Sequence, residues 1–124
     1  MPNVAEIIEA VNTLADEQSP TNQIILWLNN AIARINMEAN AKFPFIKTET
    51  ETPAIPDEWH FLLLVPYATA RIKQMDSSQF EYRDLFDEFE TNLKAFVFLY
   101  PIPDEYKNAE IGDAQSIKVI YGVD

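Results

Sequence analysis

Large apolar side chains recur between residues 82 and 100 at the spacing of one face of an α-helix, and this is the strongest such pattern in the chain. The repeated positions are Tyr82, Leu85, Phe86, Phe89, Leu93, Phe96 and Tyr100. Ser78 and Glu81 form a capping box before the pattern, and Pro101 and Pro103 end it. Because a face this wide must be covered by other apolar groups, the pattern predicts a helix that packs into a helical core.

Two further helices are predicted in the first third of the chain. Asn3 and Glu6 form an Asx variant of the capping box, which predicts a first helix over residues 4–16. Ser19 is expected to cap a second helix, with Pro20 at its first position and its end near residue 41. The apolar positions of these helices are Val4, Ile7, Ile8, Val11 and Leu14 in the first and Ile24, Ile25, Leu28, Ala31, Ile32 and Ile35 in the second.

A third helix is predicted from Pro56 to about Met75, with an acidic first turn. Its expected buried stripe consists of Trp59, Leu62, Leu63, Pro66 and Ala70. Pro66 has no backbone N–H to donate to the residue four positions earlier, so we expect a kink at this point. Only the short turn at 76–78 separates this helix from the next, which predicts that the two pack antiparallel.

The segment between the second and third helices, residues 43–56, contains three prolines and cannot be helical throughout. Residues 46–52 have the composition of a solvated loop, but Thr alternates with Glu or Lys there, which leaves a short exposed strand as the alternative. Phe43, Phe45 and Ile46 place three large apolar side chains in this segment. They either fold back over the bundle or contact a neighbouring subunit, and we predict them as partner-binding residues.

The last nine residues, 116–124, differ in character from the helical body. The segment contains five β-branched or aromatic residues: Ile117, Val119, Ile120, Tyr121 and Val123. Such residues suit a half-buried strand, and a lone strand is not stable in water, so the segment needs a partner. It pairs either with residues 46–52 of its own subunit or with another chain, and we expect another chain because the polar residues 104–115 supply reach.

These elements predict a mainly α protein. Residues 1–103 are expected to form a small antiparallel helical bundle of about four helices, and residues 104–124 an extended, strand-forming C-terminal arm. The predicted partner-binding residues are the five apolar residues of the arm together with Phe43, Phe45 and Ile46.

The composition argues against several classes of function. The chain has 20 acidic and 9 basic residues and a net charge of −11, which repels the phosphate backbones of nucleic acids. It has no cysteine and no glycine before Gly112, so thiol chemistry and a glycine-rich phosphate loop are excluded. The N-terminus has no basic region typical of a secretory signal, and the apolar run at 61–70 is too short to span a membrane. We expect a soluble protein made in the cytoplasm.

Two groups of polar residues are candidate sites. His60 is the only histidine and has no further zinc ligands in the sequence, so we interpret it as a partly exposed residue on a helix face. The acidic residues of the fourth helix lie opposite its aromatic face and are interpreted as a solvated surface: Glu81, Asp84, Asp87, Glu88 and Glu90. Ion pairs are expected from Arg83 to Asp87 and from Glu90 to Lys94. We therefore predict no catalytic, cofactor-binding or metal site, and no enzyme activity.

Residues 55–96, IPDEWHFLLLVPYATARIKQMDSSQFEYRDLFDEFETNLKAF, resemble the head-to-tail connector (adaptor) proteins of tailed bacteriophages. In that family a Pro-Asp opens a helix bearing Leu and small residues, an Asp/Ser turn follows, and the next helix carries Tyr, Phe and Leu near helical spacing. The matching positions are Pro56, Asp57, Leu63, Ala68, Ala70, Asp76, Tyr82, Phe89 and Leu93. The resemblance spans most of residues 20–100, and the internal Pro66 departs from it.

The resemblance implies a structural virion protein at the head–tail interface that forms a homo-oligomeric ring, expected to be a dodecamer, below the portal. Such a ring extends the DNA channel, through which DNA passes without specific binding, and it provides the platform for a tail or stopper protein. Arms in this family reach neighbouring subunits or the portal, so the resemblance implies that residues 116–123 are donated to another chain. An acidic wall would suit a conduit because it does not retain passing DNA. No cofactor and no membrane is implied.

Two other functions remain open at this point. Another small phage morphogenesis protein, such as a tail-completion factor or chaperone, would share the helices. An acidic inhibitor that mimics DNA is suggested by the net charge of −11. A ring is expected for the connector, and a monomer or dimer for the inhibitor.

Overall fold

The structure, a computed structural model, describes residues 3–75 and 81–108 of the chain. Its elements are α1 (Val4–Ala15), α2 (Thr21–Ala39), α3 (Asp57–Trp59), the π-helical turn η1 (His60–Leu64), α4 (Val65–Met75), α5 (Glu81–Leu99) and the 3-10 turn η2 (Asp104–Tyr106). Because α3, η1 and α4 are continuous, they form one helix, the third of four. The predicted mainly α fold is confirmed, and the described ranges contain no strand.

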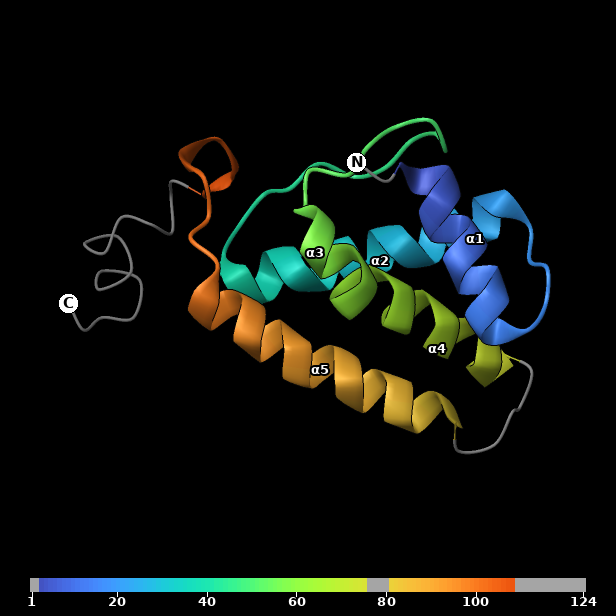
Figure 1. Cartoon of the computed structure of the whole chain (residues 1–124). Helices are drawn as coiled ribbons and strands as arrows, with labels where there is room; N and C mark the ends of the chain where they lie inside the picture. The colour runs from blue at the N-terminus through green and yellow to red at the C-terminus, as the bar shows by residue number, and fades with distance from the viewer. Residues whose placement is uncertain (1–2, 76–80, 109–124) are drawn as a thin grey trace.

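The second half of this third helix, α4, is the centre of the bundle. It contacts α1, α2 and α5, and Figure 1 shows α5 running alongside it in the opposite direction. Every residue from Leu63 to Ala70 is buried, as expected for a helix covered on all sides. The predicted antiparallel pairing of the third and fourth helices is confirmed. The turn at 76–78, including the predicted Ser78 cap, lies outside the described residues.

The predicted apolar face of α5 is confirmed where it meets the core. Phe89, Leu93 and Phe96 are at most 2% exposed. Two predicted core positions elsewhere are wrong, because Leu14 is 51% and Leu62 is 39% exposed. Leu62 lies in η1, a π-helical turn with hydrogen bonds between residues five apart, in which successive residues are separated by a smaller angle than in an α-helix. A buried stripe predicted with the α-helical period therefore assigns Leu62 to the wrong face.

The N-terminus of α1 is capped from two sides. Asn3 and Glu6 form the predicted capping box, with both hydrogen bonds present. The N–H groups of Val4 and Ala5 donate to the carbonyls of Glu51 and Glu49 at 2.8 and 2.9 Å. Residues 46–52 are therefore a loop that satisfies the first free N–H groups of a helix, and the alternative prediction of a strand is wrong.

Two asparagines of α2 fasten this connecting loop to the bundle. Asn36 donates to the carbonyl of Phe43 at 3.1 Å and accepts from its N–H at 2.9 Å. Asn29 makes the same pair of bonds with Ile46, at 2.9 and 2.7 Å. Each side-chain amide thus binds both the N–H and the C=O of one loop residue, as the backbone of an adjacent β-strand does. These bonds hold Phe43 and Ile46 in the core.

The internal proline is accommodated by η1 and by a side chain of α5. In a regular α-helix the carbonyl of Leu62 would accept from residue 66, but Pro66 has no N–H. The side-chain amide of Asn92 donates to this carbonyl at 2.9 Å. Where the sequence predicts a kink at Pro66, the structure has a π-helical turn directly before the proline, and the bond from Asn92 joins this turn to α5.

Helix boundaries in this part of the chain are formed without glycine. Asp16 and Asn40 adopt the left-handed conformation at the C-terminal ends of α1 and α2, with φ of 61° and 58°. The expected Ser19 cap of α2 is wrong, because Pro20 occupies the cap position and makes no side-chain cap bond. The Ser19 N–H instead donates to the side chain of Asn12 at 3.0 Å.

Residues after α5 return to the bundle before the described chain ends. The backbone carbonyl of Tyr106 accepts a hydrogen bond from the N–H of Lys42 at 2.8 Å. The centroid of the Tyr106 ring lies 5.0 Å from that of the Phe43 ring. Asn108 donates to the carbonyl of Asn40 at 3.3 Å. The first five residues of the segment predicted as an extended arm, 104–108, are therefore tied to the C-terminal end of α2.

Candidate interaction surface

The described residues contain an open pocket but no cluster of metal-binding side chains. Within ranges 3–75 and 81–108, no three His, Asp or Glu side chains gather in a way that could hold a metal ion. An open pocket of about 270 Å³ is lined by Ala39, Asn40, Ile102, Lys107 and Asn108. It contains no carboxylate or imidazole, and Lys107 is paired with Asp104 at 3.3 Å. In the described helices we also find none long and apolar enough to cross a membrane.

His60 is buried, and the prediction that it is partly exposed is wrong. Its side chain is fully buried at the start of η1, where Nε2 donates to the carbonyl of Ile55 at 2.6 Å. With the proton on Nε2, Nδ1 is a bare acceptor, and it has no hydrogen-bond partner among the described residues. The bond from His60 joins the end of the 43–56 loop to the start of the third helix.

Acidification should destabilise the protein through His60. Burial lowers the pKa of His60, whereas the bond to Ile55 and the charges of Asp57 and Glu58 act in the opposite direction. As the pH falls, the unfolded chain therefore binds this proton before the folded one does. The contribution of His60 to stability is complete above about pH 6.5, its unfolded pKa, and is lost as the pH falls through the folded-state pKa.

Urea unfolding between about pH 8 and pH 5.5, above the range in which carboxylates titrate, measures this effect. The variant His60→Gln keeps a donor but cannot titrate, so its stability should change less over this interval. An equal decline in both proteins would assign the pH dependence to other groups.

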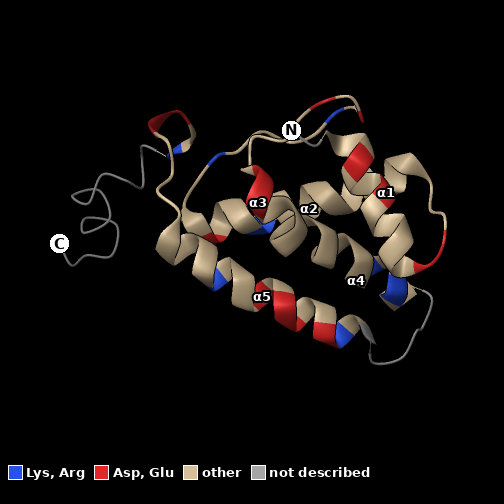
Figure 2. Cartoon of the chain, viewed as in Figure 1, with Lys and Arg blue, Asp and Glu red and all other residues tan. Residues whose placement is uncertain are grey.

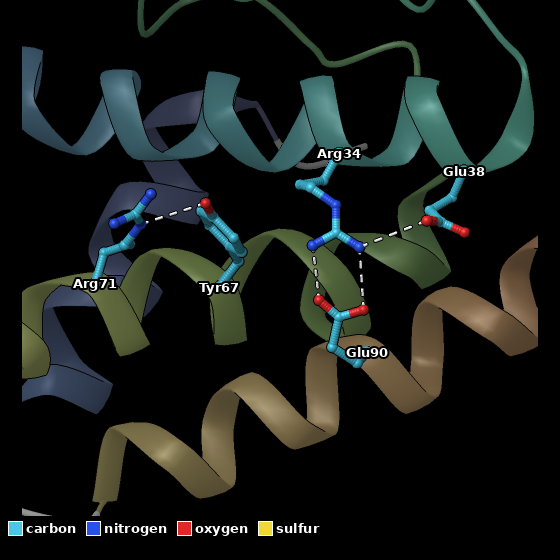
Figure 3. A network of polar contacts seen from close by, with 5 residues as sticks. All are labelled: Arg34, Glu38, Tyr67, Arg71 and Glu90. Atoms are coloured by element: carbon cyan, nitrogen blue, oxygen red, sulfur yellow. Dashed lines mark hydrogen bonds and ion pairs between the residues drawn. The ribbon is translucent and has the colours of Figure 1, made fainter.

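A polar network joins α2 to α5 across the edge of the bundle (Figure 3). The guanidinium of Arg34 makes two bonds to the carboxylate of Glu90, at 2.8 and 3.1 Å, and a longer contact of 3.7 Å to Glu38. The bond to Glu90 is the main reason that the pKa of Arg34 is raised. Because both side chains are partly exposed, the pair contributes no more than about 1 kcal/mol, and its two parallel bonds join α2 to α5.

This network corrects the predicted surface of α5. Glu90 was expected to pair with Lys94 on a solvated face, but it faces α2 and binds Arg34. Asp84, Asp87 and Glu88 are exposed, as predicted. The pairing was missed because Arg34 and Glu90 are 56 residues apart in the sequence.

Exposed apolar side chains are concentrated at the C-terminal end of α5. Val97, Phe98 and Leu99 are 43%, 86% and 64% exposed. Successive residues of an α-helix are about 100° apart, so Phe98 lies on the side of α5 opposite the buried Phe96. These three residues form what we term the apolar end of α5.

Charged residues are concentrated at the N-terminal end of α5, away from its apolar end. Figure 2 shows the acidic residues in its first half, whereas the end after Lys94 carries no charged residue. The next charged residue in the chain is Asp104. An exposed apolar surface without charges is a feature of sites that contact other proteins, although single exposed apolar residues need no explanation.

The predicted partner-binding residues fall into three groups. Phe43 and Ile46 are 2% and 4% exposed. Of the two alternatives for these residues, the structure shows that they fold back over the bundle and belong to the core of their own chain. Phe45, 52% exposed, remains at the surface. The five predicted residues of the arm lie outside the described ranges. Sequence reasoning missed the apolar end of α5, although the uninterrupted run from Ala95 to Tyr100 carries a visible signal.

Comparisons with known proteins give no relative for this chain. No protein-family model matches it. No curated protein and no solved structure matches it either.

Proposed function

We propose that this chain is a non-enzymatic structural protein of a tailed-bacteriophage particle, a head-to-tail connector that assembles as a ring below the portal. The resemblance of residues 55–96 to connector proteins and the compact helical bundle both support the proposal. In this role the chain extends the DNA channel and provides a platform for a tail or stopper protein.

The observation that carries the proposal is the apolar end of α5. Phe98 is 86% exposed in a chain that buries three other phenylalanines, Phe43, Phe89 and Phe96, almost completely. Leaving a ring of this size in water forgoes roughly 1.5 to 3 kcal/mol of burial. A protein whose work is assembly recovers this free energy when the surface meets a neighbouring subunit.

The charge of the chain is compatible with a conduit for DNA. Asp84, Asp87 and Glu88 project from the first half of α5 into solvent. With a net charge of −11 per copy, a ring of many copies repels phosphate groups and does not retain them. The same charge favours an acidic inhibitor equally, so the assembly state is what separates the two functions.

Deleting residues 113–124 tests the proposal. We expect virions assembled with the intact chain to contain it in multiple copies at the head–tail joint, visible by electron microscopy of purified particles. The truncated chain should keep the thermal midpoint of the intact protein but enter particles poorly. A full-length chain with Ile117→Ser, Val119→Ser and Tyr121→Ser serves as a matched variant, since it keeps the length of the tail and loses its apolar character.

Two results would contradict the proposal. Virions without the chain would exclude a connector and favour a chaperone or another assembly factor. A monomer that binds a nucleic-acid-binding enzyme would instead favour the acidic inhibitor.

A further inference from the structure

We propose that residues 52–56, the end of the loop before the third helix, form a latch that opens when His60 takes up a proton, while the helical bundle stays folded. Such an opening is local, unlike the loss of overall stability on acidification, and it does not depend on the proposed connector function. Two features of the structure support it: the distribution of hydrogen bonds along the loop, and two buried polar atoms without hydrogen-bond partners among the described residues.

The hydrogen bonds that hold the 43–56 loop are unevenly distributed. Its first part is fixed by the paired bonds of two asparagines of α2, and its middle by the N–H groups at the start of α1. Over residues 52–55 the described structure has one hydrogen bond to the bundle, from Nε2 of His60 to the carbonyl of Ile55 at 2.6 Å. The end of the loop can therefore separate from the third helix while the bonds of its first part and middle stay in place.

Two polar atoms in the first turns of the third helix are buried without a hydrogen-bond partner among the described residues. One is Nδ1 of His60, and the other is Oδ1 of Asp57, three residues earlier in the same helix. A buried polar atom without a partner has given up its hydrogen bonds to water, which is unfavourable. An opening of residues 52–56, which directly precede Asp57, admits water to this site and offsets part of the apolar burial that is lost.

Protonation of His60 places a charge and a new donor in this buried site. The bond to Ile55 can persist, because Nε2 donates in both forms of the ring, but Nδ1 changes from a bare acceptor into a second N–H group. His60 is fully buried, so the charge has no water around it while the loop is closed. Because η1 is packed against α1, α2 and α5, movement of residues 52–56 is the smallest change that hydrates the ring.

The surrounding charges favour the open, protonated form. The charged groups that act on His60 are Asp57 and Glu58, both in α3. Within the described ranges, no charge of the loop or of α1, α2, α4 or α5 acts on it. Tyr100, on which Glu58 also acts, has a pKa raised mainly by burial, so it stays neutral at neutral and mildly acidic pH. After opening, the imidazolium is hydrated and lies near two carboxylates.

Protons therefore bind the open form more tightly than the closed form. Burial lowers the pKa of His60 while the loop is closed, and opening removes this burial. As the pH falls below the pKa of the open form, about 6.5 for an ordinary histidine, the opening equilibrium shifts by up to about tenfold for each pH unit. The shift ends when the closed form is protonated as well.

Thiol labelling of the full-length protein tests the latch, and the chain contains no cysteine that would interfere. Ile55→Cys places a thiol in the loop and Leu93→Cys places one in α5, at positions that are 1% and 2% exposed. Labelling rates between about pH 8 and pH 5.5 are divided by those of the same thiol in unfolded protein at each pH, which removes the titration of the thiol. We expect the normalised rate to rise several-fold at position 55 and to change much less at position 93.

The variant His60→Gln, introduced together with Ile55→Cys, is the control for the proton. Glutamine can still donate to the carbonyl of Ile55 but does not titrate, so labelling at position 55 should lose its dependence on pH. The same rise with His60→Gln would refute the latch, as would a constant rate at position 55 in the parent background. Equal rises at positions 55 and 93 would also refute it, because they indicate opening of the whole bundle. This last comparison decides the question even if His60→Gln does not fold.

Discussion

Replacing Phe96 by alanine should destabilise the protein by about 3 to 5 kcal/mol, the range typical of a large aromatic residue removed from a core. Phe96 is fully buried on α5, and its ring contacts Phe43 of the connecting loop, Trp59 of the third helix and Tyr100. The truncation therefore opens a cavity where three segments of the chain meet. Urea or thermal unfolding followed by circular dichroism measures the loss, and a chain near the lower end of ordinary stability would not fold at all.

Phe98→Ala is the matched control for this experiment. It removes the same side chain from the same helix, two residues further on, at a position that is 86% exposed. Because little burial is lost, its effect on the unfolding free energy of the isolated protein should stay within about 0.5 kcal/mol. Comparable losses from Phe96→Ala and Phe98→Ala would show that the face of α5 assigned to the core is wrong.

The double variant Asn29→Ala with Asn36→Ala should lose roughly 2 to 6 kcal/mol of stability. Each asparagine makes two hydrogen bonds to the backbone of the connecting loop, at Ile46 and at Phe43. Truncation leaves these partly buried backbone groups without partners, which costs about 1 to 3 kcal/mol per site. Unfolding in urea checks the size of the loss.

A further measurement separates this mechanism from general damage to α2. The loop that Asn29 and Asn36 hold also covers the N-terminus of α1, so the double variant should speed hydrogen exchange at Val4 and Ala5, whose N–H groups donate to the loop. Asn30→Ala, on the same helix but without such bonds, is the control and should be within about 0.5 kcal/mol of the parent. If the control loses as much as the double variant, the asparagine bonds do not hold the loop.

Local patterns in the sequence were enough to predict the helical body. The spacing of Phe89, Leu93 and Phe96 identified the buried face of α5, and Asn3 with Glu6 identified the start of α1. Both depend on residues within one or two turns of each other, where the geometry of the helix alone decides which groups meet.

Tertiary structure decided the features that depend on distant residues. His60 is buried because the 43–56 loop closes over it, and Glu90 leaves the solvated face because Arg34 of α2 is opposite. The helix forms a π-helical turn before Pro66. In this turn the carbonyl of Leu62 accepts a hydrogen bond from the side chain of Asn92, which lies 30 residues after Leu62 in the sequence. Periodicity specifies which face of a helix is apolar, but the partner of a polar group depends on which segments the packed core brings together, and this is a property of the whole fold.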